Sequence, residues 1–312
     1  MSTLNELWFA MLTSAEDLHS KPGTDSPIGL VINESGVERL NHRFDENTPQ
    51  EDQERGQANL YSLDVRGRNI DGAELDDSSV RVSNLGGDQW EPELLYIWGE
   101  AGTTPLDSEI VPIAIETEIT TKLSTDSNDV GAVPSMPVRL VAKGSSNMQI
   151  NRLMLLVMTA GKPHTGIIAV ATFPSETDDP IELEIVNDAG IAVKFEIPDT
   201  PQQDLERGQA NLYFIPVSVP FTKRSLRSNS IRLRIKGDDA WSPSRLFLFG
   251  LDDASGRPES IVPLVHVPEW NLGDLSTDSS EGQEQITLPL VEEREAPDVG
   301  GVAPPVVGPV TA

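Results

Sequence analysis

The stretch Glu54-Arg55-Gly56-Gln57-Ala58-Asn59-Leu60-Tyr61 occurs a second time, letter for letter, as Glu206-Arg207-Gly208-Gln209-Ala210-Asn211-Leu212-Tyr213. An identity of this length within one chain of 312 residues marks an internal duplication rather than a coincidence of composition. The two copies are separated by about 150 residues, which is the size of a whole domain. The chain is therefore predicted to contain two copies of one fold.

Further matches extend the duplication on both sides of this segment. They pair residues 7–13 with 153–159, 24–28 with 177–181, 87–92 with 238–243, 110–112 with 261–263 and 123–127 with 275–279. We predict two domains of the same fold, spanning residues 1–143 and 148–292 and joined by a short polar linker. Residues 293–312 are rich in Pro and are expected to form an extended tail, either disordered or lying on a neighbouring molecule.

Short runs of alternating apolar and polar residues predict β-strands. In Ile231-Arg232-Leu233-Arg234-Ile235 the aliphatic side chains face one side and Arg the other, and Ile181-Glu182-Leu183-Glu184-Ile185 places Glu outward. With 24 Gly and 24 Pro, long helices are not expected. The predicted fold is all-β: two tandem duplicated antiparallel β-sandwich domains with a Pro-rich C-terminal tail. Further strands are expected over residues 28–32, 60–65, 80–82, 94–98, 138–141, 153–160, 246–249 and 286–290, with a helical turn over 50–55.

The charge is strongly negative in both halves of the chain, with 50 acidic against 23 basic residues and a net charge of −27. Such a field repels nucleic acid, and it repels anionic membrane unless Ca²⁺ intervenes. The acidity fits either a saline habitat or a functional acidic surface. There is no cysteine, hence no disulfide and no thiolate site. Neither a signal peptide nor a transmembrane run is recognisable, so we expect a cytoplasmic protein or one exported as part of an assembly.

The order of motifs in each copy resembles that of the PLAT (lipoxygenase-homology) domain. A strand ending in Thr precedes a turn, Gly23-Thr24-Asp25 or Glu176-Thr177-Asp178, and an Arg-Gly segment then leads into further strands and a Trp. In the PLAT family a Gly-Thr-Asp turn, an Arg-Gly segment and a Trp-bearing strand recur in this order within a β-sandwich. The resemblance covers roughly residues 5–100 and 151–251. Residues 101–142 and 252–291 lie beyond it and are expected to form an extra hairpin or an elaborated edge.

The resemblance implies a non-catalytic targeting or docking module that often holds Ca²⁺ between its loops. Asp25 and Asp178 match the acidic ligand of the Gly-Thr-Asp turn, and Asp88 and Asp239 lie in the loop before the Trp, where a second acidic ligand is expected. Ca²⁺ takes six to eight oxygen ligands, and fewer can be named here. The alternative is that Asp25 and Asp178 build Asx turns and that no cofactor is bound.

A second group of candidates consists of residues that recur in both copies and could anchor either a partner or the fold. The Arg side chains either hold the turn by a charge-assisted bond to a carboxylate or loop carbonyl, or contact a partner. The Trp side chains either fill the sandwich core or form a ligand platform. The Asn residues stand where the PLAT family often has an acid. These candidates are Arg55, Asn59, Tyr61 and Trp90 with their counterparts Arg207, Asn211, Tyr213 and Trp241.

No catalytic motif is recognisable in the sequence, and we predict that the protein is not an enzyme. The four histidines are not placed at metal-binding spacing, and there is neither a Gly-x-Ser-x-Gly elbow nor a phosphate loop. Carboxylates such as Glu182 and Glu184 alternate outward on a strand and are expected to be solvated. A glycosidase-type pair of carboxylates cannot be recognised from sequence, because it depends on spacing in space.

Two functions fit this sequence. The first is a non-catalytic tandem β-sandwich protein that docks a protein partner or self-assembles in a larger structure such as a particle, an appendage or a surface coat. The second is a Ca²⁺-dependent peripheral module that binds lipid or glycan as the accessory of an enzyme. The net charge of −27 favours the first, because it opposes anionic lipid.

Overall fold

The structure is a computed structural model that describes residues 3–15, 23–44, 55–102, 109–160, 177–198, 205–206, 208–253 and 257–292. This part of the chain is built almost entirely of β-strands, with two short 3-10 helices at Gly72–Glu74 and Lys223–Ser225. None of its helices is long and apolar enough to cross a membrane. The predicted all-β class of antiparallel sandwiches is confirmed.

The first half of the chain folds into a sandwich of two sheets, here called domain 1. Its inner sheet has the strand order β7-β6-β1-β4, and its outer sheet has the order β3-β2-β5-β8. The strands are β1 (Leu4–Thr13), β2 (Ile28–Glu34), β3 (Val37–Phe44), β4 (Ala58–Asp64), β5 (Val80–Asn84), β6 (Pro92–Ala101), β7 (Glu109–Thr117) and β8 (Ser135–Pro137).

The second half repeats this arrangement as domain 2, with an inner sheet β13-β10-β15-β16 and an outer sheet β12-β11-β14-β17. The register repeats as well: Gly29 pairs with Ser83 in domain 1, as Glu182 pairs with Arg234 in domain 2. The strands are β10 (Ile150–Thr159), β11 (Ile181–Asn187), β12 (Gly190–Glu196), β13 (Ala210–Phe221), β14 (Ile231–Ile235), β15 (Pro243–Asp252), β16 (Ser260–Val267) and β17 (Gln285–Thr287).

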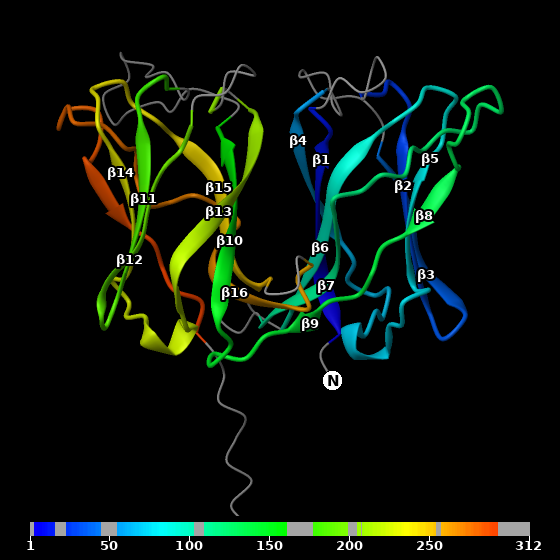
Figure 1. Cartoon of the computed structure of the whole chain (residues 1–312), viewed down its shortest axis with the longest axis horizontal. Coiled ribbons are helices and arrows are strands. Elements are labelled where there is room, and N and C mark those ends of the chain that lie inside the picture. The colour runs from blue at the N-terminus through cyan, green and yellow to red at the C-terminus, as the bar shows by residue number, and fades with distance from the viewer. Residues whose placement is uncertain are drawn as a thin grey trace, which may run out of the picture.

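The two domains stack into four layers with three apolar cores (Figure 1). One core fills each sandwich, between its inner and outer sheets. The third lies between the two inner sheets and is built from both domains, with Trp8, Tyr96 and Trp98 from domain 1 and Phe247 and Phe249 from domain 2. The inner sheets are thus buried on both faces, and this explains why β1 and β6 carry continuous apolar runs instead of alternating ones.

The inner sheets are also joined edge to edge, into one nine-stranded sheet. β4 and β13 meet at a single pair, Ala58 with Ala210. At the other side the short strand β9 (Ala142–Lys143), which follows domain 1 in the chain, pairs with β16 of domain 2. Just before β9, the Val141 N–H donates to the Ile113 carbonyl at 3.0 Å. The segment between the domains therefore pairs with both of them.

The segments beyond the PLAT resemblance extend both sheets instead of forming a separate hairpin. In domain 1, residues 101–142 supply β7 to the inner sheet and β8 to the outer sheet. Some strand bounds differ from expectation: β17 spans Gln285–Thr287, and residues 138–141 form an isolated bridge, Leu140 to Ala114, in place of a strand. The expected helical turn over 50–55, except Arg55, and the tail over 293–312 lie outside the described residues.

Candidate functional site

The repeated eight-residue segment begins as a turn that is bonded to the end of the first strand of its domain. Gly56 and Gly208 have φ of 70° and 76°, a left-handed conformation that favours glycine. The Gly56 N–H donates to the Thr13 carbonyl at 3.2 Å. Arg55 donates from Nε and Nη2 to the Ala15 carbonyl at 3.0 and 2.8 Å. Arg55 therefore holds the turn through a loop carbonyl, which is one of the two roles considered for it. Its counterpart Arg207 lies outside the described residues.

The Asn and Tyr residues of the segment belong to the interior. Asn59 and Asn211 are buried, and Asn211 Oδ1 accepts a hydrogen bond from the Leu205 N–H at 3.2 Å. The Tyr61 ring lies 4.6 Å from that of Phe44, measured between centroids, and packs on the core of domain 1. Tyr213 is buried in the core of domain 2. The described residues of the segment thus form a turn and the start of a strand, and they contribute side chains to the core.

The two copies of the segment meet each other at the domain junction. Ala58 and Ala210 are the same residue of the repeat, and they are the pair that joins β4 to β13. A contact between equivalent residues is the signature of two-fold symmetry, as in an isologous dimer interface. Ala58, Leu60 and Ala210 also belong to the interdomain core, so each segment packs against the other domain as well as its own.

Trp90 and Trp241 lie in the sandwich cores and not on a surface. Both are fully buried. Each indole N–H donates to the Thr that ends the first strand of its domain, Trp90 to Thr13 Oγ1 and Trp241 to Thr159 Oγ1, both at 3.0 Å. These bonds satisfy the single polar atom of a large apolar side chain, and they tie the loop before the Trp to the inner sheet.

In domain 1 the Thr-Asp turn and the loop before the Trp are held together by hydrogen bonds. Asp88 Oδ2 accepts from the Asp25 N–H at 2.9 Å, and the Asp88 carbonyl accepts from Thr24 Oγ1 at 3.1 Å. Asn84 Nδ2 donates to the same carbonyl at 2.6 Å. The structure thus brings Asp25 and Asp88 together, with the Asp88 carboxylate accepting the backbone N–H of Asp25.

Domain 2 repeats this junction with two more acids, Asp179 at the position of Ser26 and Asp238 at that of Gly87. The Asp239 N–H donates to Asp179 Oδ2 at 2.7 Å, and Thr177 Oγ1 donates to the Asp239 carbonyl at 3.4 Å. Burial raises the pKa of Asp239, although hydrogen bonds from Thr177 and the Asp178 N–H oppose that rise. Among the described residues, no group of three or more acidic or histidine side chains is arranged to hold a metal ion.

The repeated Leu-Ser-Thr-Asp-Ser motif closes the same loop end. Leu123 is fully buried and exchanges backbone hydrogen bonds with Trp90, at 2.8 and 2.9 Å. Thr125 donates from N–H and Oγ1 to the Gly86 carbonyl at 3.1 and 2.7 Å. In domain 2, Leu275 bridges Trp241 in the same way. The Leu of the motif is therefore part of the core in both domains.

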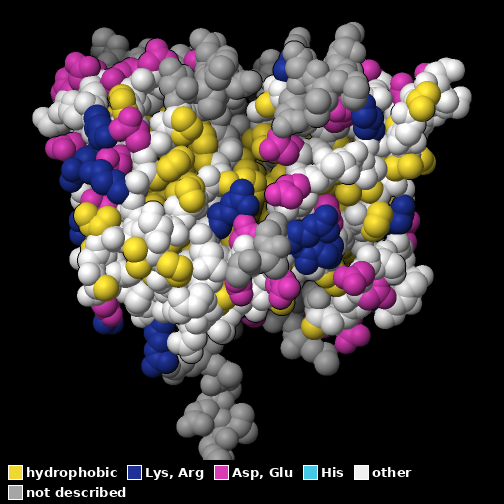
Figure 2. Space-filling view, viewed as in Figure 1, with side chains coloured by type: hydrophobic (Ala, Val, Ile, Leu, Met, Phe, Trp, Pro, Cys, Tyr) yellow, Lys and Arg dark blue, Asp and Glu magenta, His cyan; other side chains and the backbone are white. Residues whose placement is uncertain are grey.

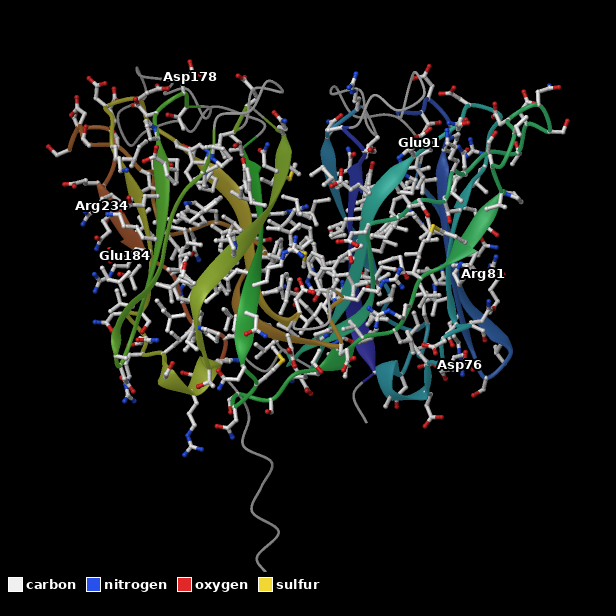
Figure 3. The ribbon with its side chains drawn as sticks, viewed as in Figure 1. Asp76, Arg81, Glu91, Asp178, Glu184 and Arg234 are labelled. Atoms are coloured by element: carbon white, nitrogen blue, oxygen red, sulfur yellow. The ribbon has the colours of Figure 1, made fainter. Side chains whose placement is uncertain are left out.

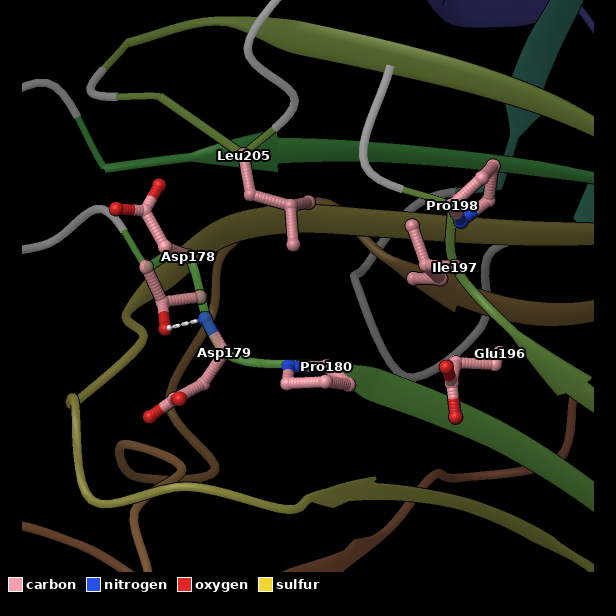
Figure 4. A pocket seen from close by; sticks show the side chains of 8 residues that line it. Asp178, Asp179, Pro180, Glu196, Ile197, Pro198 and Leu205 are labelled. Carbon is pink, nitrogen blue, oxygen red and sulfur yellow. Dashed lines mark hydrogen bonds between the residues drawn. The ribbon is translucent and has the colours of Figure 1, made fainter.

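A pocket of about 330 Å³ opens beside the Thr-Asp turn of domain 2 (Figure 4). Asp178 and Asp179 line one side, and Glu196 and Ile197, at the end of β12, line the other. The loop ends of the two domains lie at the same end of the molecule, as the labelled Asp178 and Glu91 show in Figure 3. The stacking of the domains thus brings the two acidic loop ends to one side.

The interdomain core contains a polar group that the sequence interpretation missed. The side chain of His266, on β16, is 7% exposed, and its Nε2 lies 3.4 Å from both Trp98 Nε1 and Glu100 Oε1. Trp8 Nε1 donates to Glu100 Oε1 at 2.9 Å. Burial lowers the pKa of His266 to about 3, so the ring is neutral at pH 7 and accepts the hydrogen bond of Trp98. The unbroken apolar runs of β1 and β6 were the available signal of a second buried face.

The expectation that Glu182 is solvated was wrong. Its side chain does face outward, but the residue is 2% exposed because Lys194 and Lys236 cover it, each with Nζ at 3.2 Å from a carboxylate oxygen. Burial alone would raise the pKa of Glu182, but the hydrogen bonds from Lys236 and Lys194 outweigh it and lower the pKa. The mixture of basic and acidic side chains on this outer side is visible at the left of Figure 2.

No family model matches the chain, and neither does any curated protein. Among solved structures it is similar to the alpha toxin from Clostridium absonum, with a TM-score of 0.31, 16% identity, and 46% of this chain and 32% of that chain covered. Human GIVD cytosolic phospholipase A2 aligns with a TM-score of 0.12 and 10% identity over 94% of this chain and 34% of that chain. The chain thus spans about a third of either protein's length, and at these TM-scores the similarities carry no argument about activity.

Proposed function

We propose that this chain is a non-catalytic docking or structural protein that binds a protein partner, or further copies of itself, within a larger assembly. The observation that carries the proposal is the third core, which packs the two inner sheets face to face and unites the sandwiches into one body. A body of this kind suits a scaffold, since it holds two loop ends in a fixed relation.

The chemistry of the loop ends supports a role without catalysis. The carboxylates of Asp88 and Asp179 accept backbone N–H groups of the opposite loop and so build the turns. The pocket beside Asp178 is lined by acidic and apolar side chains. The resemblance of the motif order to PLAT domains points the same way, because that family consists of targeting and docking modules.

The proposal is tested by isolating the tagged full-length chain from its source after mild cross-linking. We expect it to sediment as a larger species than the purified chain alone, with a protein partner or further copies of itself in fixed ratio. Flotation with phosphatidylserine vesicles, with Ca²⁺ or with a chelator, tests the alternative of a Ca²⁺-dependent lipid module. A chain that sediments alone at cellular concentration, or that floats with vesicles only when Ca²⁺ is present, would contradict the proposal.

A further inference from the structure

Three apolar side chains are exposed at the loop end of domain 1. Val130 is 92% exposed, Leu85 45% and Val133 39%. Half of the large apolar residues that are exposed in the described part of the chain therefore lie at this one corner. Exposed apolar groups that cluster, rather than occurring singly, mark an interaction surface.

The pairing of β5 with β8 brings two of these residues to the same end of one strand pair. Ser83 pairs with Ser135, and the ladder continues with the Asn84 N–H donating to the Pro134 carbonyl at 3.1 Å. Leu85 directly follows Asn84 and Val133 directly precedes Pro134, so both residues lie at the end of this strand pair, just beyond its last hydrogen bond. The loop of Val130 is fastened to the same corner by the two hydrogen bonds from Thr125 to the Gly86 carbonyl.

Domain 2 shows that the fold does not require apolar residues at these positions. Lys236 occupies the position of Leu85, and Gln283 occupies that of Val133. The loop is also longer in domain 1, since Val133 is ten positions after Leu123 and Gln283 eight positions after Leu275. The additional length carries Val130. The apolar side chains are thus a property of domain 1 and not of the duplicated sandwich.

Carboxylates surround the apolar side chains. Asp25, Asp88 and Asp126 are all exposed at this loop end. Asp88 Oδ2 accepts from the Asp25 N–H at 2.9 Å, and Asp126 Oδ1 accepts from the Asn128 N–H at the same distance. These bonds fix the positions of the carboxylates and leave their negative charge at the surface. We call Leu85, Val130 and Val133, with these three Asp residues, the tip patch.

We propose that the tip patch docks a segment of a partner protein in which apolar side chains are flanked by Lys or Arg. The apolar groups supply contact area that gains from burial, and the carboxylates supply charge complementarity. A second copy of this chain or an anionic membrane would bring further negative charge against the three Asp residues. The inference rests on the docking function proposed above and names the chemistry of its partner.

Two matched variants separate the tip patch from exposed apolar surface in general. The tip variant, Leu85→Lys with Val130→Ser and Val133→Gln, introduces the Lys and Gln of domain 2. The control variant, Ile191→Ser with Val219→Ser, removes side chains that are 62% and 63% exposed on domain 2. Thermal melting of both variants is measured first. Because Leu85 also lies over Gly29, where an added Cβ would come within 3.3 Å of its side chain, peptide binding is compared at a temperature at which both variants are fully folded.

The probes are three labelled peptides of equal length with alternating Leu and Lys, Leu and Glu, or Ser and Lys, and binding is measured by fluorescence anisotropy at physiological salt. We expect the Leu/Lys peptide to bind the full chain and the control variant alike, and the tip variant about tenfold more weakly. The Ser/Lys and Leu/Glu peptides should bind more weakly than Leu/Lys. Equal binding of Leu/Lys to tip and control variants, or of Ser/Lys and Leu/Lys to the wild type, would overturn the proposal.

A second experiment keeps this inference distinct from the docking function. A photoreactive residue is placed at Val130, or at Gln283 as the control, and the cross-linked peptide from the source cells is sequenced. A basic segment with apolar residues, captured from position 130 and not from 283, supports the proposal. If the chain co-purifies with a partner that cross-links elsewhere, the inference is wrong and the docking function stands. If the chain associates neither with a partner nor with further copies of itself, the docking function itself fails.

Discussion

The outer sheets of the two domains have the same topology but differ in chemistry at a pair of facing surface positions. In domain 2 the buried carboxylate of Glu182 is held between Lys194 and Lys236, with both Nζ–O distances at 3.2 Å. In domain 1 the register places Gly29 at the position of Glu182 and Leu85 at that of Lys236. A Cβ added at Gly29 would come within 3.3 Å of the Leu85 side chain, so Leu85 fills the space that Glu182 and Lys236 fill in the other copy.

This difference between the outer sheets shows which positions the fold requires to stay the same. The inward residues of β2 are Ile28, Leu30 and Ile32, and their counterparts in β11 are also aliphatic; all are fully buried. The inner faces therefore kept their chemistry after the duplication, because close packing tolerates few changes. The outer faces were free to diverge, and they diverged in pairs: an ion pair in one copy stands where a glycine and an apolar side chain stand in the other.

The largest effect is expected at a second difference between the copies, in the interdomain core. His266 occupies the position that Ile115 holds in domain 1. Its folded-state pKa of about 3 is below the ordinary value of 6.5. The unfolded chain therefore takes up a proton first as the pH falls, and stability is lost between pH 6.5 and 3. At about 1.36 kcal/mol per pKa unit the loss is on the order of 5 kcal/mol.

The measurement is urea unfolding of the wild type and of His266→Ile at several pH values between 7 and 3. The variant carries the residue of domain 1, so it should lose less stability with acid than the wild type over this range. A wild type that becomes more stable towards pH 5 would show that Glu100, 3.4 Å away, holds an imidazolium, and the predicted direction would be wrong.

The next largest effect is expected where Glu182 and Lys236 of domain 2 replace Gly29 and Leu85 of domain 1. Lys236→Leu places the Leu of domain 1 beside Glu182 and removes one of the two lysines over this carboxylate. We expect a loss of about 2 kcal/mol, in the range for a buried polar group that loses part of its hydrogen bonding. Because Lys194 remains, the loss should stay below the 3–5 kcal/mol roughly typical of a stranded buried charge.

The double variant Glu182→Gly with Lys236→Leu recreates the combination found in domain 1. If the two positions are coupled, the double variant is more stable than the sum of the two single changes predicts, by about 1 kcal/mol or more. The cycle is read from urea unfolding of the full chain. If the changes in unfolding free energy simply add, the two positions are not coupled, and Gly29 and Leu85 arose independently of each other.

Much of each sandwich could be predicted from the sequence, because strands with one buried face alternate in polarity. The run predicted over 231–235 is β14, Ile231–Ile235, with the expected inward Ile and Leu. The same pattern correctly placed Glu182 outward. It could not show that Lys194 and Lys236 fold over the carboxylate, because burial by long side chains of neighbouring strands leaves no periodic signal.

The stacking of the two domains could not be predicted from the sequence, for a different reason. β1 and β6 are apolar on both faces, so their pattern indicates burial without showing what covers the second face. The identity of the repeated segment was evident, but not that Ala58 and Ala210 touch, since contact between copies depends on long-range packing. The polar cluster of Glu100 and His266 exists only through that stacking.

A smaller effect tests whether the repeated segment does the same task in both copies. Arg55→Ala removes the two hydrogen bonds to the Ala15 carbonyl, at 3.0 and 2.8 Å. Because this contact is exposed, we expect a loss of about 1–2 kcal/mol, at the low end for a charge-assisted bond. Arg207→Ala should cost a similar amount if the segment is structural. Both variants are measured by thermal melting, and unchanged melting with loss of a co-purifying partner would make the segment a binding site.

The smallest effect separates the outer sheets by their response to salt. On domain 2, Arg232 lies 3.4 Å from Glu184 and Lys236 lies 3.2 Å from Glu182. In domain 1 the two carboxylates are replaced by Val31 and Gly29, and Lys236 is replaced by Leu85. Raising NaCl from about 0.05 to 1 M shortens the screening length to about 3 Å and weakens exposed ion pairs.

Salt also screens the self-repulsion of a chain with a net charge of −27, which stabilises both domains. The expected result is therefore a difference: with added salt, amide exchange should slow more in β2 than in β11, by a free energy of less than about 1 kcal/mol. Peptides covering 28–33 and 181–186 report the two strands in the same sample, so each molecule is its own control; Glu34 is left out because it has its own ion pair with Arg39, at 3.0 Å. The difference should shrink in Glu184→Gln with Arg232→Gln, which removes one pair without changing the net charge. Equal slowing of both strands would mean that the ion pairs on the outer sheet of domain 2 make no salt-dependent contribution to its stability.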